Sequence, residues 1–399
     1  MAALITAEQL HSNCQRMQTR ETAGRVAIVG GGINGAGIAW ELARRNYEVV
    51  LYEKGEAGAQ TSSATTKMVH GGLRYLERMH VGLVRESLRE RARLLEAVPQ
   101  LVKPLEIMLP VYRDSPRGRA TIRLGLTMYD ALSGGHNIAR HRKLSVQELT
   151  DRAPLRAEGL LGGFSYWDAQ VDDHQLVRTV IASAIRDGAA VREQTRVEKI
   201  ERRGDRWLIR TDRGDEATFD VVVNAAGPWM NELLRANGIR ASYVLLLVRG
   251  SHLVLRHRVS ESGLLLQSTT DKRVFFVLPW KGTTLVGTTE VVQTEPLDSV
   301  QATAEEIDYL LARFNRYFRN PITRDDVQST FAGVRPLVGR AANPSAIGRD
   351  ARVVREGTLV NVFGGKLTTF MALAEKVALR VDNAFGRTRT AKPPVFAPP

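Results

Sequence analysis

Six residues near the amino end of the chain have the types and spacing to hold a dinucleotide. The segment Gly30-Gly31-Gly32-Ile33-Asn34-Gly35 reads G-x-G-x-x-G. It lies between an apolar run at 25–29, predicted to be a buried strand, and a helix predicted at 34–45. Glycines allow a tight turn and a close approach of the backbone to a pyrophosphate, which then faces the positive end of the helix. A glycine-rich loop that merely packs tightly is the alternative.

An acidic residue stands where the ribose of such a ligand would need one. The second predicted strand, 48–52, ends at Glu53. A carboxylate in this place binds the hydroxyls of the adenosine ribose. The strand, helix, strand and acid together predict a βαβ unit in a parallel sheet. The cofactor would lie against Gly30, Gly32, Asn34, Gly35 and Glu53.

Two polar segments follow the acid. Thr61-Ser62-Ser63-Ala64-Thr65-Thr66-Lys67 is dense in hydroxyls, and His70-Gly71-Gly72-Leu73-Arg74-Tyr75 comes shortly after it. Hydroxyls can wrap a long extended ligand, and the ribityl-pyrophosphate of FAD suits them better than a nicotinamide. An ordinary Ser/Thr loop is the alternative. We therefore expect FAD contacts from Thr61, Ser62, Ser63, Lys67, His70, Gly71 and Gly72.

Two further strands run into turns of small residues. The segment 221–229 ends in Ala226-Gly227-Pro228-Trp229, and the segment 362–369 contains Gly364-Gly365-Lys366 before a predicted helix. Helix-terminal N–H groups beside a cation would stabilise negative charge on a reduced flavin ring. Both segments could instead be simple connections. On the first reading, the cofactor also contacts Gly227, Gly364, Gly365, Leu367 and Thr368.

The composition favours anionic ligands. Of the 399 residues, 56 are Lys or Arg and 43 are Asp or Glu, which gives a formal net charge of +13. This balance favours phosphorylated metabolites, an acidic membrane surface or nucleic acid. Nucleic-acid binding is not expected, because no zinc spacing or stacking motif accompanies the charge. The one cysteine, Cys14, excludes an internal disulfide and a multi-cysteine metal site, and no metal site is predicted.

The elements that position these residues alternate in type along the chain. Helices are predicted at 81–97, 171–187, 303–318 and 366–385. Short strands are predicted at 196–202, 207–211 and 219–223, and an antiparallel meander at 246–255, 264–269, 274–280 and 284–289. This order indicates an α/β fold of two interleaved domains. No apolar run reaches the roughly 18 residues of a membrane span, and no signal pattern is present, so a cytoplasmic protein is expected.

Several segments together resemble one family. GGGINGAGIA, TSSATTKMVHGGLRYLE, NAAGPW, RGSHLVL, VLPWKGTTLVGTTE, FAGVRPLVG and VFGGKLTTF are similar, in the same order over residues 23–385, to the FAD-dependent glycerol-3-phosphate dehydrogenases. These are D-amino-acid-oxidase-like flavoproteins. The resemblance implies a Rossmann-like FAD-binding domain interleaved with an antiparallel-sheet substrate domain. The helical C-terminal domain usual in that family is not expected here.

The resemblance implies an activity and the domain boundaries that go with it. Flavin N5 would accept a hydride from C2 of sn-glycerol 3-phosphate, giving dihydroxyacetone phosphate, and the electrons would pass to a quinone or another acceptor. The expected segments are a leader at 1–22, FAD-binding parts at 23–100, 168–240 and 331–386, substrate-binding parts at 101–167 and 241–330, and a disordered tail at 387–399.

The resemblance also implies site residues. Arg74, Tyr75, Arg349 and Lys366 would bind the substrate, and His252 and Arg335 would lie near the reacting alcohol. A phosphate dianion calls for several cationic donors, and the alcohol proton needs an acceptor such as imidazole. A surface ion pair for each arginine and a structural role for the histidine are the alternatives.

Three alternatives remain open at this stage. The substrate could be an amino acid, a 2-hydroxy acid or another polyol phosphate, and the chain could be a flavin-binding protein without catalysis. The stretch 101–130 mixes apolar residues with Arg113, Arg117, Arg119 and Arg123. It could dock peripherally on an anionic membrane face, or it could form a helix of the substrate domain whose arginines are solvated.

Overall fold

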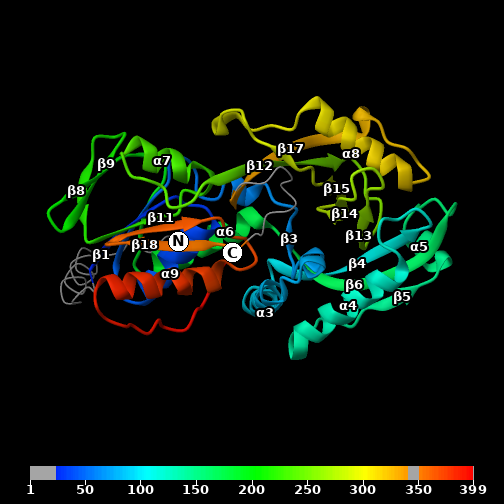
Figure 1. Ribbon diagram of the computed structural model, residues 1–399, viewed down its shortest axis with the longest axis horizontal. Helices are drawn as coiled ribbons and strands as arrows, with labels where there is room; N and C mark the ends of the chain where they lie inside the picture. Colours follow the sequence, from blue (N-terminus) through cyan, green and yellow to red (C-terminus); the bar gives the residue numbers. More distant parts are fainter. Residues whose placement is uncertain (1–23, 340–349, 399) are drawn as a thin grey trace, which may run out of the picture.

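The computed structural model describes residues 24–339 and 350–398. The predicted leader, Cys14 and Arg349 lie outside these residues. Figure 1 shows two sheet-based halves side by side, with the chain passing between them several times. The predicted α/β fold class, with a Rossmann-like part and a second sheet, is confirmed.

The first half is built on a six-stranded sheet. Its strand order is β18 (Arg352–Glu356), β19 (Leu359–Phe363), β11 (Val221–Asn224), β1 (Arg25–Val29), β2 (Glu48–Tyr52) and β7 (Ala190–Arg192). All neighbours pair in parallel except β18 with β19. The inner strands are continuous apolar runs because both faces of the sheet are covered. The strand at 190–192 was not predicted.

Helices cover one face of this sheet and a small sheet covers the other. Helices α2 (Ile33–Arg44), α6 (Asp173–Arg186) and α9 (Phe370–Ala384) pack together, while β8 (Val197–Arg203), β9 (Arg206–Thr211) and β10 (Glu216–Phe219) form the small antiparallel sheet. Figure 1 shows α9 and the β8–β9 hairpin on opposite sides of the sheet. The side chain of Asp172 caps α6 by accepting the Gln175 N–H at 3.1 Å.

The second half is built on a ten-stranded sheet. Its main path is β16 (Val291–Val292), β12 (Leu245–Leu255), β15 (Thr283–Gly287), β14 (Val274–Trp280), β13 (Gly263–Gln267), β4 (Val102–Tyr112), β6 (Leu160–Val171) and β3 (Met68–Val69). Strand β17 (Val327–Val338) pairs with β12, and β5 (Arg142–Leu144) with β6. The predicted meander is confirmed within two residues at each end, but β13 pairs with β4 in parallel.

Alternating side chains build a core on each face of this sheet. Leu264 and Leu266 face a cluster that includes α8 (Ala304–Tyr317) and α5 (Val146–Arg152), whereas Leu265 faces α3 (Val81–Ala97) and α4 (Arg119–Ser133). This is the two-residue period of a strand buried on both faces. The predicted domain division remains a prediction. Two of its boundaries, at 167/168 and 330/331, fall inside β6 and β17.

The stretch 101–130 contributes most of its apolar residues to the core. Ile107 and Met108 are fully buried in β4, and Ile122 and Leu126 are buried on one face of α4, whereas the Leu124 side chain is exposed. Arg119 and Arg123 lie on the exposed face of the same helix. The stretch therefore has the form of a helix of the second half with solvated arginines. In the part of the chain that the structure describes, no helix has the length and apolar character needed to cross a membrane.

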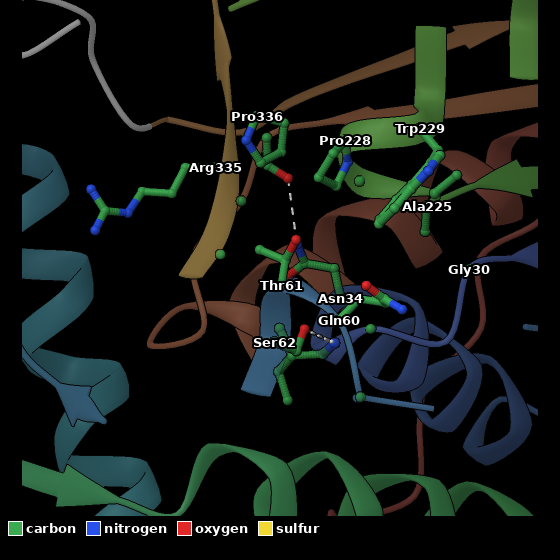
Figure 2. Close-up of a pocket in the computed structure, with 18 of the residues that line it drawn as sticks. Gly30, Asn34, Gln60, Thr61, Ser62, Ala225, Pro228, Trp229, Arg335 and Pro336 are labelled. Carbon is green, nitrogen blue, oxygen red and sulfur yellow. Dashed lines mark hydrogen bonds between the residues drawn. The ribbon is translucent and has the colours of Figure 1, made fainter. Parts of the chain in front are cut away.

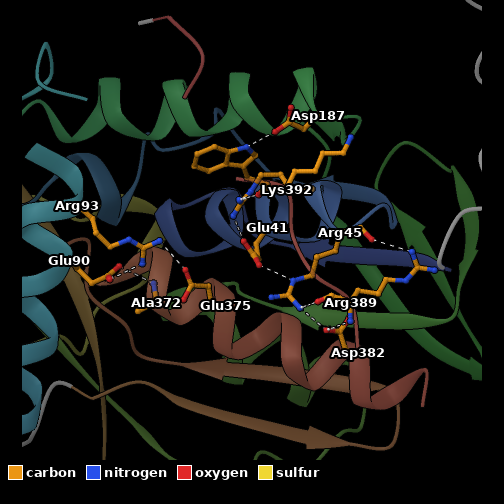
Figure 3. A network of polar contacts seen from close by, with 12 residues as sticks. Glu41, Arg45, Glu90, Arg93, Asp187, Ala372, Glu375, Asp382, Arg389 and Lys392 are labelled. Carbon is orange, nitrogen blue, oxygen red and sulfur yellow. Dashed lines mark hydrogen bonds and ion pairs between the residues drawn. The ribbon is translucent and has the colours of Figure 1, made fainter. Parts of the chain in front are cut away.

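Two helices next to the first sheet are joined by buried charges (Figure 3). The Glu41 carboxylate of α2 accepts from Arg45 Nε at 2.8 Å, and Arg45 Nη1 lies 2.6 Å from the Asp382 carboxylate of α9. Tyr47 also donates its hydroxyl to Asp382 at 2.6 Å. Each charge is buried, and each is paired, as a charge in an interior must be. This network, defined by Glu41, Arg45 and Asp382, fixes α2 against α9.

The segment 387–398, predicted to be disordered, instead packs on this network. It contains no helix or strand, yet the Arg389 carbonyl accepts from Arg45 Nη1 at 2.7 Å and the Ala397 N–H donates to Ser183 Oγ at 2.8 Å. The Phe396 ring meets the Trp40 ring edge-on at 4.6 Å between centroids. The proline content suggested disorder, but the aromatic and backbone contacts to α2 and α6 order the segment.

Replacing Phe396 with alanine should therefore lower the free energy of unfolding by about 1–2 kcal/mol, because the contact with Trp40 is lost. Trp40 is 2% exposed, so its emission should shift to the red. Chemical unfolding followed by tryptophan fluorescence measures both effects. The matched control is Val395→Ala, since that side chain is 63% exposed and should change neither quantity. A Phe396→Ala protein as stable as the parent would contradict the packed segment.

Candidate active site

The turn from β1 into α2 is shaped by close backbone approaches. Gly30 has φ +108°, and a Cβ there would lie 2.5 Å from the Ala225 carbonyl oxygen of the neighbouring strand. A Cβ at Gly35 would overlap the Gly30 carbonyl oxygen. Only glycine fits these two positions. The turn therefore leaves the first N–H groups of α2 at the carboxyl edge of the sheet, where they can face an anion.

The Glu53 carboxylate is held by the same turn. It accepts the Gly31 N–H at 2.7 Å through Oε2 and the Gly55 N–H at 2.9 Å through Oε1. These bonds fix the side chain at the edge of a cavity of about 510 Å³ that opens at this end of the sheet. A carboxylate held in this way is placed to accept hydrogen bonds from the hydroxyls of a ribose.

The hydroxyl segment crosses the amino end of α2 (Figure 2). Ser62 Oγ accepts the Ile33 N–H at 2.9 Å, and Thr61 Oγ1 donates to the Val334 carbonyl at 3.0 Å. Thr61 and Ser62 belong to the short 3₁₀ turn η1 (Thr61–Ser63), which thereby joins α2 to β17. The cavity thus runs between the two halves of the molecule, with this turn in its wall.

Most of the predicted cofactor residues line this cavity. The lining includes Gly30, Gly32, Asn34, Glu53, Thr61, Ser62, His70, Gly227, Gly364, Gly365, Leu367 and Thr368. The remaining five, Gly35, Ser63, Lys67, Gly71 and Gly72, are not in the lining. Lys67 Nζ pairs with the Asp173 carboxylate at 2.7 Å, and the Gly71 N–H donates to the Tyr129 hydroxyl at 2.8 Å. These contacts lie outside the cavity and hold the segment that carries the lining residues Thr66 and His70.

The turn before α9 closes the far side of the cavity. Gly364 and Gly365 have φ +75° and +111°, and a Cβ at Gly365 would overlap the Asn34 side chain. Thr368 Oγ1 accepts the His70 N–H at 3.3 Å. The positive φ angles delay the helix, which begins at Phe370 and not at 366 as predicted. The delay leaves Lys366 and Leu367 in the cavity wall.

Cationic side chains gather at the other end of the cavity. Lys366 Nζ lies 4.1 Å from the centre of the Tyr75 ring, and Arg335 Nη2 donates to Thr288 Oγ1 at 2.9 Å. Figure 2 shows Arg335 projecting from β17 away from Gly30, Asn34 and Ser62. Arg74 and Arg335 both face the Glu290 carboxylate, at 3.9 and 3.8 Å. The structure thus brings Arg74, Tyr75, Arg335 and Lys366 together.

His252 lies behind the wall. It is fully buried, its ring stacks on Phe331 with centroids 4.8 Å apart, and Nε2 lies 3.0 Å from Thr66 Oγ1. Thr66 is in the lining, whereas His252 is not. Burial lowers the pKa of His252 well below its usual range, and the charges of Arg335 and Lys67 lower it further. The imidazole is therefore neutral.

Sequence reasoning missed several lining residues. Thr195, Arg196 and Val197 follow the unpredicted strand β7, whose carboxyl end meets that of β2 beside Glu53. Lys54 Nζ lies 3.9 Å from the centre of the Trp229 ring, and both residues line the cavity. A Cβ at Gly333 would lie 2.7 Å from the Ala64 carbonyl oxygen. Of these, only the position of Lys54 after Glu53 and of Trp229 after the Gly227 turn carried a signal.

Comparison with known proteins gives consistent results. The sequence pattern of a family described as FAD dependent oxidoreductase matches residues 25–380. The chain is 39% identical over 372 residues to D-erythritol 1-phosphate dehydrogenase of Brucella abortus. The alignment covers 90% of this chain and 73% of that protein. It is 35% identical over 372 residues to the aerobic glycerol-3-phosphate dehydrogenase of Escherichia coli, covering 90% and 72%.

A solved structure has the same fold. The glycerol-3-phosphate dehydrogenase of Bacillus halodurans, complexed with FAD, matches with a TM-score of 0.73 and 25% identity, over 96% of this chain and 68% of that one. The predicted cofactor, FAD, is thereby confirmed. The cavity fits it, because the glycine turn leaves the amino end of α2 at the cavity, and the Glu53 carboxylate is fixed at the edge of the same cavity.

Replacing Glu53 with glutamine should weaken FAD binding about tenfold or more, because an ionised acceptor for the ribose hydroxyls is lost. Titration of the apoprotein with FAD, followed by flavin fluorescence, measures this. Glu295→Gln is the matched control, since that side chain is exposed and lies outside the cavity lining. Equal affinities for the Glu53 variant and the parent would contradict the assignment.

The neutral state of His252 should make stability depend on pH. The unfolded chain binds a proton at this histidine below about pH 6.5, whereas the folded chain resists it, so folding is disfavoured as the pH falls. Between about pH 7 and 5, the parent should lose stability more steeply than His252→Asn, by up to about 1.4 kcal/mol per pH unit. Urea unfolding at a series of pH values measures the difference.

The exposed His257 provides the control for this pH series. A His257→Asn protein should follow the parent over the whole range. If His252→Asn also ran parallel to the parent, the buried neutral imidazole would be contradicted.

Proposed function

Because this chain belongs to the family of FAD dependent oxidoreductases, we propose that it oxidises sn-glycerol 3-phosphate to dihydroxyacetone phosphate. When bound, FAD supplies the acceptor for the hydride that leaves the alcohol carbon. The chain's own residues bind the phosphate, orient the alcohol and receive its proton. The relatives named for polyol phosphates support this choice of substrate.

The observation that carries the proposal is the group of cations at one end of the cavity. Arg335 and Lys366 line it, and Arg74 lies beside Arg335 on the shared partner Glu290. A phosphate dianion needs several such donors, whereas a carboxylate needs a single arginine clamp. The amino-acid and 2-hydroxy-acid alternatives explain this group less well. Arg349, also assigned to the substrate, remains a prediction because it lies outside the described residues.

The alcohol proton has a path to an acceptor in this arrangement. The Thr66 hydroxyl lies in the wall and is 3.0 Å from His252 Nε2. We propose that Arg335 orients the alcohol and that His252 takes up the proton through Thr66. The low pKa of His252 follows from burial and from Arg335 and Lys67, and a bound dianion would offset those cations. His252 thus becomes a better base when substrate is present.

A second candidate substrate is a longer polyol phosphate. The relative from Brucella abortus is named for D-erythritol 1-phosphate, and its identity to this chain, 39%, exceeds the 35% of the relative from Escherichia coli. The same cations would bind either phosphate. Comparison of sn-glycerol 3-phosphate with D-erythritol 1-phosphate as substrates therefore decides the length of the polyol.

The electron acceptor and the location follow from the proposed activity. We propose a quinone or a similar acceptor, reached in the cytoplasm or at the inner face of the membrane. The exposed Leu124 and the neighbouring exposed Arg123 of α4 offer a small basic and apolar surface of the kind that peripheral docking would require.

Anaerobic bleaching of the flavin absorbance tests the proposed function. The purified holoenzyme should be yellow, and sn-glycerol 3-phosphate should bleach it, whereas glycerol and glycine should not. Comparison with D-erythritol 1-phosphate decides the polyol length, and a quinone analogue should restore the colour. A yellow protein that no member of the panel bleaches would identify a flavin-binding protein without this activity.

Two substitutions test the residues near the alcohol. His252→Asn should slow flavin reduction by about 100-fold, the usual effect of losing a proton acceptor, and Arg335→Lys should slow it by about tenfold or more. Stopped-flow reduction at saturating substrate measures both. The exposed His257 and Arg319 supply the controls His257→Asn and Arg319→Lys. If neither test variant is slower than the parent, the assignment is wrong.

A further inference from the structure

A buried carboxylate lies at the centre of the arginine group. The Glu290 side chain is 5% exposed and follows β15, where sequence reasoning gave it no role. Its carboxylate faces Arg74 at 3.9 Å, Arg273 at 3.9 Å and Arg335 at 3.8 Å. These arginines come from the 3₁₀ turn η2 (Leu73–Arg78), the residue before β14, and β17. Elements far apart in sequence thus place three cations around one acid.

The backbone that bears Glu290 is anchored from both sides. Arg273 Nη1 donates to the Glu290 carbonyl at 3.0 Å. The adjacent Thr289 donates its hydroxyl to Glu306 of α8 at 2.5 Å and accepts the Ser251 N–H at 2.8 Å. Glu306 is itself buried and is paired with Arg249 at 2.8 Å. Three hydrogen bonds thus hold the backbone that carries the Glu290 carboxylate.

The geometry shows how Glu290 acts on its neighbours. The three separations exceed hydrogen-bond length, so the carboxylate holds the guanidinium groups through its charge. Three guanidinium groups around one point would otherwise repel one another and turn toward solvent. The formal charges of these four side chains sum to +2, so the group as a whole attracts a phosphate monoester dianion.

We propose that Glu290 is a positioning residue for the phosphate end of the substrate, and that Arg273 anchors it. Glu290 and Arg273 do not line the cavity, but Arg335 does, so Glu290 acts through Arg335 and Arg74. This inference rests on the proposed function in one respect, that a phosphate lies against these arginines. It adds two residues, Glu290 and Arg273, to those that the sequence assigned.

Steady-state kinetics of the Glu290→Gln holoenzyme test the proposal. Loss of the Glu290 charge weakens the hold on Arg74 and Arg335, so KM for sn-glycerol 3-phosphate should rise about tenfold or more. The fall in kcat should stay within about threefold, because the hydrogen bond to Thr288 still directs Arg335. The dissociation constant of inorganic phosphate, read from the flavin absorbance change, should rise in parallel. Glu290→Asp keeps the charge and should recover most of the phosphate affinity. Glu295→Gln removes the same charge from an exposed neighbour and should match the parent.

Several results would overturn the proposal. They are equal or tighter phosphate binding by Glu290→Gln, a loss confined to kcat, or a parent holoenzyme that binds no phosphate. If Glu290→Gln fails to retain FAD, Arg273→Gln replaces it and should weaken phosphate binding about threefold or more through the lost anchor. An unchanged affinity in that variant is equally contradictory. A parent that binds phosphate but is not reduced by sn-glycerol 3-phosphate refutes the proposed function alone, because the phosphate titration still tests Glu290.

Discussion

At the amino end of α2, three segments that are far apart in the chain approach one another more closely than side chains would permit. Gly30 lies against Ala225 of the next strand, Gly35 against Gly30, and Gly365 against Asn34. The absent Cβ atoms bring the helix end, the Glu53 carboxylate and the turn before α9 to one cavity. A larger residue at Gly30 or Gly35 would displace backbone, because it would meet the Ala225 or the Gly30 carbonyl, and one at Gly365 would displace the Asn34 side chain. The cofactor site depends on this constraint first and on hydrogen bonds second.

The substrate end depends on a different kind of constraint, the joining of two sheets. Thr61 binds the backbone of β17, and Gly333 of the same strand passes close to Ala64. Strand β17 pairs with β12, which carries His252, and itself carries Arg335. The hydroxyl turn that crosses α2 is therefore also the surface against which β17 is aligned. A shift of one sheet against the other would move the cations relative to the bound flavin, so this junction couples binding of the cofactor to binding of the substrate.

The sequence predicted local features well and distant pairings poorly. The glycine turn, Glu53, Thr61 and Ser62 were recognisable because strand, turn, helix and acid follow one another within about thirty residues. Lys67 and Gly71 looked like ligand contacts but support the wall, since their partners Asp173 and Tyr129 are about sixty to a hundred residues away. Alternation placed His252 on a strand face but could not show that Phe331 and Thr66 cover it. Glu290 carried no signal at all, because its three arginines come from η2, from the residue before β14 and from β17, and these segments meet only in the folded chain.

The joint between α2 and α9 has a consequence for how such a sequence can change over time. Glu41, Arg45 and Asp382 are buried in an alternating row of charges, so loss of any one leaves a neighbour ionised in a dry interior. Replacements at these positions therefore have to occur in pairs that remove one positive and one negative charge together, and Arg44, which also pairs with Glu41, is subject to the same constraint. The segment 387–398 depends on the same charges, because the Arg389 carbonyl accepts a hydrogen bond from the Arg45 guanidinium. Residues 387–398 have the composition of a disordered tail, but replacements in them are constrained by the buried charges of α2.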